Sequence, residues 1–226
     1  MFYNEEKTIK MCEEDPSLIF ELMREGHFEF VEKLLDKQVV DINTLDEASN
    51  DVITRLLRAK QYRLVLKYMK KKTWDVNHQN IDGNTFAHYL VSINYVNVLE
   101  IIKELKKNKK FIPNIKNKKD ETILDKSINE NYIYTTLKIL EDKRFDSIDV
   151  ASFQKLVKTY IKNPAYGRHS KLDNLTFIVN TLEEKDKLLP NVKNLVDEIN
   201  DNMEMIKGDI LKNKFRRLEG LINEFV

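Results

Sequence analysis

The chain has 226 residues, of which 42% are hydrophobic and 33% charged, and this is enough for one large domain or two small ones. Its 38 basic and 37 acidic residues leave a net charge of +1, so the global charge gives no reason to expect a nucleic acid or a membrane as partner. The single cysteine, Cys12, excludes an internal disulfide and favours a reducing compartment.

The N-terminal segment MFYNEEKTIK is charged, which does not fit a signal peptide. No apolar run approaches the ~18 residues that a membrane-spanning helix needs. We therefore expect a soluble, intracellular protein of the cytoplasm. The low numbers of glycine (5) and proline (4), together with many Leu, Ile, Lys and Glu residues, predict an all-α fold with short loops.

Four segments repeat one helical pattern at nearly constant spacing. They begin at Gly26, Lys60, Asn94 and Asn131, with intervals of 34, 34 and 37 residues. Each segment has a small or polar residue, then an aromatic residue within two positions, and then apolar residues at helical spacing. A fixed period of this length is typical of repeat proteins.

Two further markers share this spacing. The tripeptide DIN at Asp41 recurs as DVN at Asp75 and as IPN at Ile112, and DGNT at Asp82 recurs as KDET at Lys119. The sequence therefore predicts four units of helix, tight turn, helix and extended loop. Their expected ranges are 14–48, 49–82, 83–119 and 120–149.

Local signals support the ends of these helices. Asp15 is a suitable N-cap residue, and Pro16 then occupies the first helical position, where proline is favoured. A cation near the C-terminal end of a helix interacts favourably with the negative end of the helix dipole and stabilises the helix by roughly 0.3–1 kcal/mol. Such cations are expected at the ends of the second helices, at Lys37, Lys70–Lys72, Lys106 and Lys107.

The segment DGNTFAHYL, residues 82–90, resembles the ankyrin-repeat motif, in which Asp-x-x-Gly-x-Thr-Pro-Leu-His-x-Ala begins each repeat. The resemblance implies that Gly83 lies in the loop between units with a positive φ, which is unstrained only for glycine. It also implies that Thr85 caps the first helix of the unit and that His88 fastens the loop through its ring nitrogens. It covers about residues 14–149.

The chain departs from the ankyrin pattern at several positions. Phe86 stands in place of proline and Ala87 in place of leucine. In the next unit, Asp120 replaces glycine, Ile123 replaces proline and Asp125 replaces histidine. We expect a short ankyrin-like helical solenoid in residues 1–149, followed by a helical C-terminal capping region in 150–226 that can include a degenerate fifth repeat.

No motif of a known catalytic or metal site is present, so we expect a non-enzymatic protein without cofactor or metal. No two histidines have zinc-like spacing, and Cys12 could form a nucleophilic pair with a histidine only through distant folding. Trp74, the only tryptophan, is expected to pack between repeats.

The segment from Lys103 to Lys119 holds eight lysines against one glutamate, and Lys70–Lys72 lie one repeat earlier. Stacking of units would bring the two groups together into a lysine ridge. The ridge is interpreted either as helix-end charge and solubility or as a docking surface for an acidic protein partner. Nucleic acid is not expected, because no arginine or interleaved aromatic residue accompanies the lysines.

The resemblance implies a protein-interaction module that holds or masks a protein partner through its loop tips and first helices. The predicted contact residues are Gln79, Asn80, Ile81, Asp82, Asn84, Tyr89, Ser92, Lys106, Lys107, Lys109, Lys110, Lys116, Lys118 and Lys119.

Two alternatives stay open. In the first, the chain is an effector or complex subunit whose C-terminal helices, residues 190–225, dock to a partner or self-associate. In the second, it is an enzyme with a site in residues 150–226, for which Tyr166 and His169 would be candidates. The divergent repeats also fit a viral or pathogen effector acting in the host cytosol or nucleus. The sequence makes no prediction of the oligomeric state.

Overall fold

The computed structural model describes residues 4–93 and 98–130, together with residues 139, 142 and 144. The described residues contain helices and no β-strand, which confirms the all-α prediction for this part of the chain. Contacts between Cα atoms divide the chain into two units after Lys126, and nearly all described residues belong to the first. The expected boundary at residue 149, the capping region 150–226 and the helices at 190–225 lie outside the described residues.

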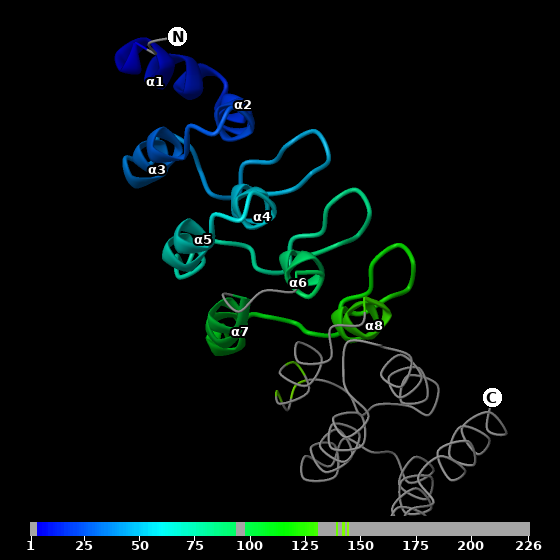
Figure 1. Cartoon of the computed structure of the whole chain (residues 1–226). Coiled ribbons are helices and arrows are strands. Elements are labelled where there is room, and N and C mark those ends of the chain that lie inside the picture. The colour runs from blue at the N-terminus through cyan, green and yellow to red at the C-terminus, as the bar shows by residue number, and fades with distance from the viewer. Residues whose placement is uncertain (1–3, 94–97, 131–138, 140–141, 143, 145–226) are drawn as a thin grey trace, which may run out of the picture. The chain divides into compact units, whose positions relative to one another are not determined.

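The helices follow one another in pairs, and longer loops connect each pair to the next (Figure 1). Helices α2 and α3 are joined by residues 25–27, and α4 and α5 by residues 59–61. The bounds are α1 Glu5–Glu14, a 3-10 turn Pro16–Leu18, α2 Ile19–Arg24, α3 Phe28–Asp36, α4 Val52–Arg58, α5 Tyr62–Tyr68, α6 Phe86–Leu90, α7 Val98–Lys107 and α8 Ile123–Asn129.

The predicted N-cap at Asp15 is present, but the first turn that it opens is a 3-10 turn that leads into α2. The Asp15 Oδ1 atom accepts hydrogen bonds from the backbone N of Ser17 (3.0 Å) and from its Oγ (2.6 Å). At the other end of α2, Gly26 has a φ of +83° and ends the helix. Lys60, 34 residues later, has a φ of +58° after α4, so the same left-handed turn recurs without glycine.

The helices pack in two rows (Figure 1). One row contains α2, α4 and α6, and the other contains α3, α5 and α7. Helix α4 contacts α2, α5 and α6, and α5 also contacts α7. The core repeats with the sequence period, because these side chains are all at most 4% exposed: Ile19, Ile53 and Ala87, and Leu22, Leu56 and Leu90.

Trp74 joins two levels of this core, as expected for a packing residue. Its side chain is 2% exposed and meets the Phe86 ring edge-on, with 5.0 Å between ring centroids. Its Nε1 donates to Oδ2 of Asp51 at 2.9 Å. The other oxygen of Asp51 caps α4 by accepting from Thr54 N at 2.6 Å. Burial raises the pKa of the Asp51 carboxyl.

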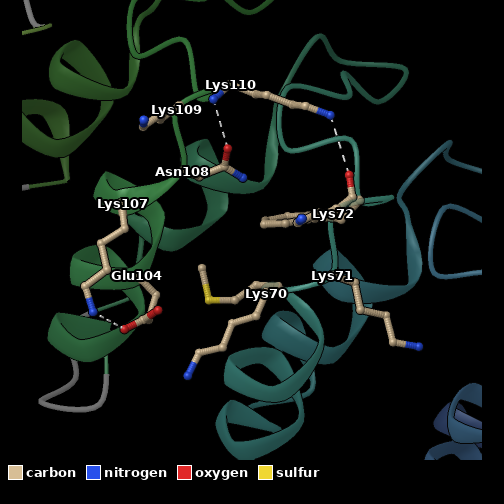
Figure 2. Close-up of a pocket in the computed structure, with 10 residues that line it drawn as sticks. Lys70, Lys71, Lys72, Glu104, Lys107, Asn108, Lys109 and Lys110 are labelled. Carbon is tan, nitrogen blue, oxygen red and sulfur yellow. Dashed lines mark hydrogen bonds and ion pairs between the residues drawn. The ribbon is translucent and has the colours of Figure 1, made fainter.

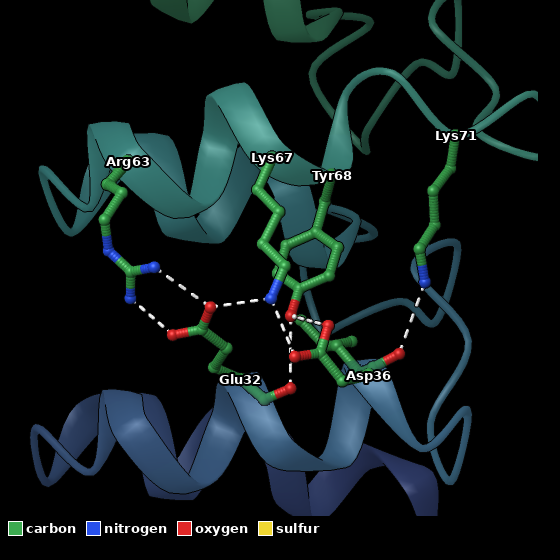
Figure 3. Close-up of polar contacts among 7 residues, drawn as sticks. Glu32, Asp36, Arg63, Lys67, Tyr68 and Lys71 are labelled. Carbon is green, nitrogen blue, oxygen red and sulfur yellow. Dashed lines mark hydrogen bonds and ion pairs between the residues drawn. The ribbon is translucent and has the colours of Figure 1, made fainter.

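A network of charged side chains joins α3 to α5 (Figure 3). Glu32 accepts hydrogen bonds from both terminal guanidinium nitrogens of Arg63 and from Lys67 Nζ at 2.7 Å. Lys67 also donates to Asp36 at 2.7 Å, and the Tyr68 hydroxyl lies 3.0 Å from Asp36 Oδ1. The hydrogen bonds from Arg63 and Lys67 lower the pKa of Glu32 to about 2.

Candidate functional site

In the described part of the chain, three loops are closed by the same set of hydrogen bonds. The loops begin at Asp46, Asn80 and Asn117. In each loop the side-chain oxygen of this residue accepts from the backbone N of the second and fourth residues that follow, at 2.8–3.0 Å. Its own backbone N donates to the carbonyl of the fourth residue. Asp and Asn are suited to such local bonding. The three loops are therefore one structure repeated.

The residue three positions after each of these has a left-handed backbone. The φ values are 58° at Ser49, 75° at Gly83 and 61° at Asp120. The implied positive φ of Gly83 is confirmed. The departure from the ankyrin pattern at Asp120 leaves the conformation unchanged, because Asp tolerates the left-handed region better than most residues do.

Backbone hydrogen bonds connect each loop to the next. The N of Ile81 donates to the carbonyl of Ala48 at 3.1 Å, and the N of Lys118 donates to the carbonyl of Asp82 at 2.9 Å. The approach is close, because a Cβ atom on Gly83 would lie 2.8 Å from the N of Lys118. The loops are therefore in direct backbone contact.

Side-chain amides repeat this connection. The Nδ2 of Asn80 donates to Oδ1 of Asn50, and the Nδ2 of Asn117 donates to Oδ1 of Asn84, both at 3.0 Å. Asn80 and Asn50 are buried, so these amides exchange hydrogen bonds away from water. Hydrogen bonds of this kind are costly to leave unmade.

His88 fastens the loop in the way that the resemblance implied. Its Nδ1 accepts from the backbone N of Thr85 at 3.1 Å and lies 2.9 Å from the Thr85 hydroxyl. Its Nε2 lies 3.0 Å from the carbonyl oxygen of Glu121 in the next loop. Since Nδ1 accepts, Nε2 carries the proton and the ring is neutral. Burial lowers the pKa of His88.

Asp125 performs the capping part of this role in the following unit. Its Oδ2 accepts from the backbone N of Thr122 at 2.9 Å and from the Thr122 hydroxyl at 2.7 Å. The sequence departure from histidine to aspartate therefore keeps the cap at the start of α8 and replaces the acceptor nitrogen with a carboxylate oxygen.

The DIN and DVN markers are explained by their asparagines, Asn43 and Asn77. Each side chain bridges two backbone groups of the next unit, one through its amide nitrogen and one through its oxygen. Asn43 binds the carbonyl of Thr73 and the N of Asp75, both at 2.9 Å, and Asn77 binds the carbonyl of Lys110 at 2.7 Å and the N of Ile112 at 2.9 Å.

Among the predicted contact residues, Asn80 is corrected to a structural residue. Its side chain is 7% exposed, and besides its loop bonds it donates to the hydroxyl of Tyr89 at 2.7 Å. Tyr89 is half-buried beneath the guanidinium of Arg58 at 5.1 Å. Ser92, expected on a first helix, follows the end of α6, and its hydroxyl donates to the carbonyl of His88.

Other predicted contact residues lie on the exposed parts of two neighbouring loops. Ile81 is 52% exposed, an unusual value for an isoleucine. Asn84 is half-buried and bonded to Asn117, and Lys116 pairs with Asp120 at 2.9 Å. The exposed set is Gln79, Ile81, Asp82, Lys116, Lys118 and Lys119. Their role in partner binding stays a prediction.

Lysines from two units line one groove at the ends of α5 and α7 (Figure 2). Its volume is about 520 Å³. We call it the basic groove, and its lining residues are Met69, Lys70, Lys71, Lys72, Trp74, Glu104, Lys107, Asn108, Lys109 and Lys110. The two lysine groups therefore lie side by side, as the stacking of units would require.

The basic groove takes in only part of the predicted ridge. Lys103 and Lys106 are outside the lining of the groove, and Lys103 pairs with Glu100 at 2.6 Å on the surface of α7. The lysines at 116, 118 and 119 belong to the third loop and are also outside the lining.

Not all lysines of the basic groove are equally available. Lys107 pairs with Glu104 at 2.5 Å, and this hydrogen bond holds the pKa of Glu104 below its usual range. Lys71 points away from the groove (Figure 2) and donates to the carbonyl of Leu35 at 3.2 Å. Within the described residues, Lys70, Lys72 and Lys109 have no carboxylate at ion-pair distance.

The described residues offer no cluster of three His, Cys, Asp or Glu side chains that could hold a metal. Cys12 is fully buried, and burial raises the pKa of its thiol. Within the same residues, no helix combines the length and the apolar character required to cross a membrane.

The sequence matches no protein-family model and no curated protein.

Sequence reasoning missed the residue that organises each loop. An Asp or Asn occurs five positions before each N-cap: Asp46 before Asp51, Asn80 before Thr85 and Asn117 before Thr122. This spacing is readable in the sequence. It would have shown that the second unit, which keeps little of the ankyrin motif, still keeps its loop.

Proposed function

We propose that the chain is a divergent ankyrin-like solenoid that binds a protein partner without catalysing a reaction. It holds or masks the partner through its loop tips and first helices, and the basic groove adds a contact for acidic groups. The observation that carries the proposal is the repeated loop, which is built three times with the same hydrogen bonds and bonded from each copy to the next.

Rigidity is the physical link between this loop and binding. A loop whose polar backbone groups are already paired loses little conformational entropy when a partner contacts it. Exposed side chains on successive loops then form an extended surface with fixed spacing. The Thr85–His88 cap and its bond to Glu121 support the ankyrin-like interpretation, because they fasten one unit to the next as that motif implies.

The test replaces apolar side chains at the loop tips with charged ones. Leu45 and Ile81 are 42% and 52% exposed on neighbouring loops. In the double variant Leu45→Asp/Ile81→Asp, affinity purification from the cells of origin, followed by quantitative mass spectrometry, should show loss of a specific partner that the wild type captures. Met11→Asp is the matched control, since Met11 is 44% exposed on α1, away from the loops.

The competing hypothesis places binding in residues 190–225. The variant Leu211→Asp/Phe215→Asp changes two apolar positions of that segment. Loss of the partner in this variant, with full capture by the loop variant, would contradict the proposal and support binding by the C-terminal segment. Circular dichroism should give the same helix content for all four proteins.

A further inference from the structure

We propose that the basic groove binds an acidic, extended peptide segment that presents a large apolar side chain between carboxylates. This inference deepens the proposed function and rests on it, because it assigns a chemistry to one segment of the protein partner. It is carried by the charge, the floor and the fixed rim of the groove.

Charge favours an anionic occupant. Six lysines and one glutamate line the groove, and the glutamate is already paired with Lys107. Lys70, Lys72 and Lys109 face solvent without a carboxylate partner among the described residues. Cations gathered in this way attract and orient acidic groups. They come from two units, so their charges are spread along the groove rather than focused on one point.

The floor of the groove favours an apolar side chain in the same segment. Met69 and Trp74 close the bottom of the groove but are only 5% and 2% exposed. Most of the apolar surface that an occupant can contact therefore belongs to the stems of the surrounding lysines, whose ammonium groups stay in water. A volume of about 520 Å³ lies within the range of roughly 300–1,000 Å³ that is usual for ligand sites.

Neither a base of nucleic acid nor a free phosphate fits as well. Trp74 is buried and its Nε1 is committed to Asp51, so it offers no face on which a base could stack. The groove lies at the C-terminal ends of α5 and α7, where the helix dipole disfavours a single concentrated anion. Carboxylates distributed along a peptide can meet the lysine ammonium groups away from these ends.

The rim is held in place before binding. The carbonyl of Lys110 accepts from Asn77 at 2.7 Å, and the backbone N of Lys110 donates to Asn108 Oδ1 at 2.9 Å. These bonds fix the segment that carries Lys109 and Lys110 against the preceding unit. Binding therefore requires ordering of lysine side chains only, which lowers its entropic cost.

The test uses the whole 226-residue chain and a short synthetic Glu- and Asp-rich peptide with one central phenylalanine. Trp74 is the only tryptophan, so its fluorescence reports on the groove directly. Fluorescence anisotropy of the labelled peptide gives the affinity. We expect saturable binding that weakens with salt, a change in Trp74 fluorescence, and a smaller change with a peptide that has alanine in place of phenylalanine.

The variant Lys72→Glu/Lys109→Glu should weaken peptide binding at least about tenfold, because two attractive contacts become repulsive. Lys7→Glu/Lys10→Glu is the matched control. It changes the net charge by the same amount on exposed positions of α1 and should leave the affinity within about twofold. Equal loss in both variants would show attraction by net charge alone and would overturn the inference.

Two further results would also overturn it. One is no binding of the acidic peptide to the wild type, and the other is tighter binding of a single-stranded oligonucleotide or of anionic vesicles through the same lysines. If the peptide fails to bind but Leu45→Asp/Ile81→Asp still abolishes partner capture, the groove inference is wrong and the proposed function stands. If the peptide binds and the loop variant captures normally, the proposed loop surface is wrong.

Discussion

His88 has no exposed surface and uses both ring nitrogens for the backbone of its own loop and of the next. Asn80 likewise commits its whole amide group to partners inside the chain. These two side chains add to the backbone hydrogen bonds that join the loops. Their loss should therefore lower the stability of the fold.

His88→Ala should lower the free energy of unfolding by about 2–4 kcal/mol, because a buried side chain and its hydrogen bonds are removed. The test is urea denaturation followed by Trp74 fluorescence. His27→Ala, which changes a histidine on the surface beside α3, is the control and should cost less than about 1 kcal/mol. Equal costs would contradict the role assigned to His88.

The stability should also depend on pH through His88. Its pKa is lowered in the folded state, first because it is buried. The unfolded chain therefore binds the proton more readily, so the neutral ring stabilises the fold above its ordinary pKa of about 6.5 and this contribution is lost as the pH falls. The loss between pH 7 and pH 5 should be smaller in His88→Ala than in the wild type, as measured by the same denaturation.

Asn80→Ala should cost about 2–3 kcal/mol, since it leaves buried polar groups of its loop and of Asn50 without their partner. Gln79→Ala, at the adjacent exposed position, should cost less than about 1 kcal/mol. Thermal unfolding of the two variants gives the comparison. A destabilisation that is larger for Gln79→Ala would contradict the structural role assigned to Asn80.

At the scale of the element, the loops pack tightly against one another, and ion pairs between side chains join α3 to α5. Gly83 lies against the backbone of the third loop, and the surface network of Glu32 ties α3 to α5. The two features differ in kind, because the first depends on shape and the second on pH and salt.

Gly83→Ala should cost more than Gly26→Ala, although both glycines have a positive φ, 75° and 83°. A Cβ at Gly26 meets nothing within 4 Å, so only the backbone strain of about 1–2 kcal/mol applies. A Cβ at Gly83 would also lie 2.8 Å from the backbone N of Lys118. We expect a difference of at least about 1 kcal/mol in chemical denaturation. Equal costs would mean that the loops are not in contact.

Glu32→Gln should reduce stability at pH 7 by about 1 kcal/mol, because Glu32 binds two cations. Its pKa is lowered to about 2, so the stabilisation is present above the ordinary range near 4.5 and is lost as the pH falls towards 2. The difference between wild type and variant should therefore shrink between pH 5 and pH 3. Glu100→Gln, which removes one partner of a single exposed pair on α7, is the control at pH 7 and should cost less than Glu32→Gln.

The helices and the period could be predicted from the sequence because buried apolar residues recur with the fold, as Leu22, Leu56 and Leu90 do. The cap at Thr85 and the turn at Gly83 could be predicted because few residue types suit them. The burial of Asn80 could not, since a polar residue in a loop is expected on the surface until its partner Asn50, 30 residues away, is placed beside it.

At the scale of the whole molecule, the described loops are bonded in series, which holds the exposed side chains of successive loops at fixed spacing. The backbone bonds of Ile81 to Ala48 and of Lys118 to Asp82 are the direct evidence. Glu47 occupies the same loop position in the first loop, and within the described residues its N has no acceptor. These three amides form a natural comparison.

Amide hydrogen exchange, measured by NMR on the whole 226-residue chain, tests this claim most directly. We predict that the amides of Ile81 and Lys118 exchange much more slowly than the amide of Glu47, although all three belong to surface loops, because only the first two are bonded to a neighbouring loop. Exchange of Ile81 and Lys118 at the rate of Glu47 would contradict the stacking of the loops, and with it the extended binding surface.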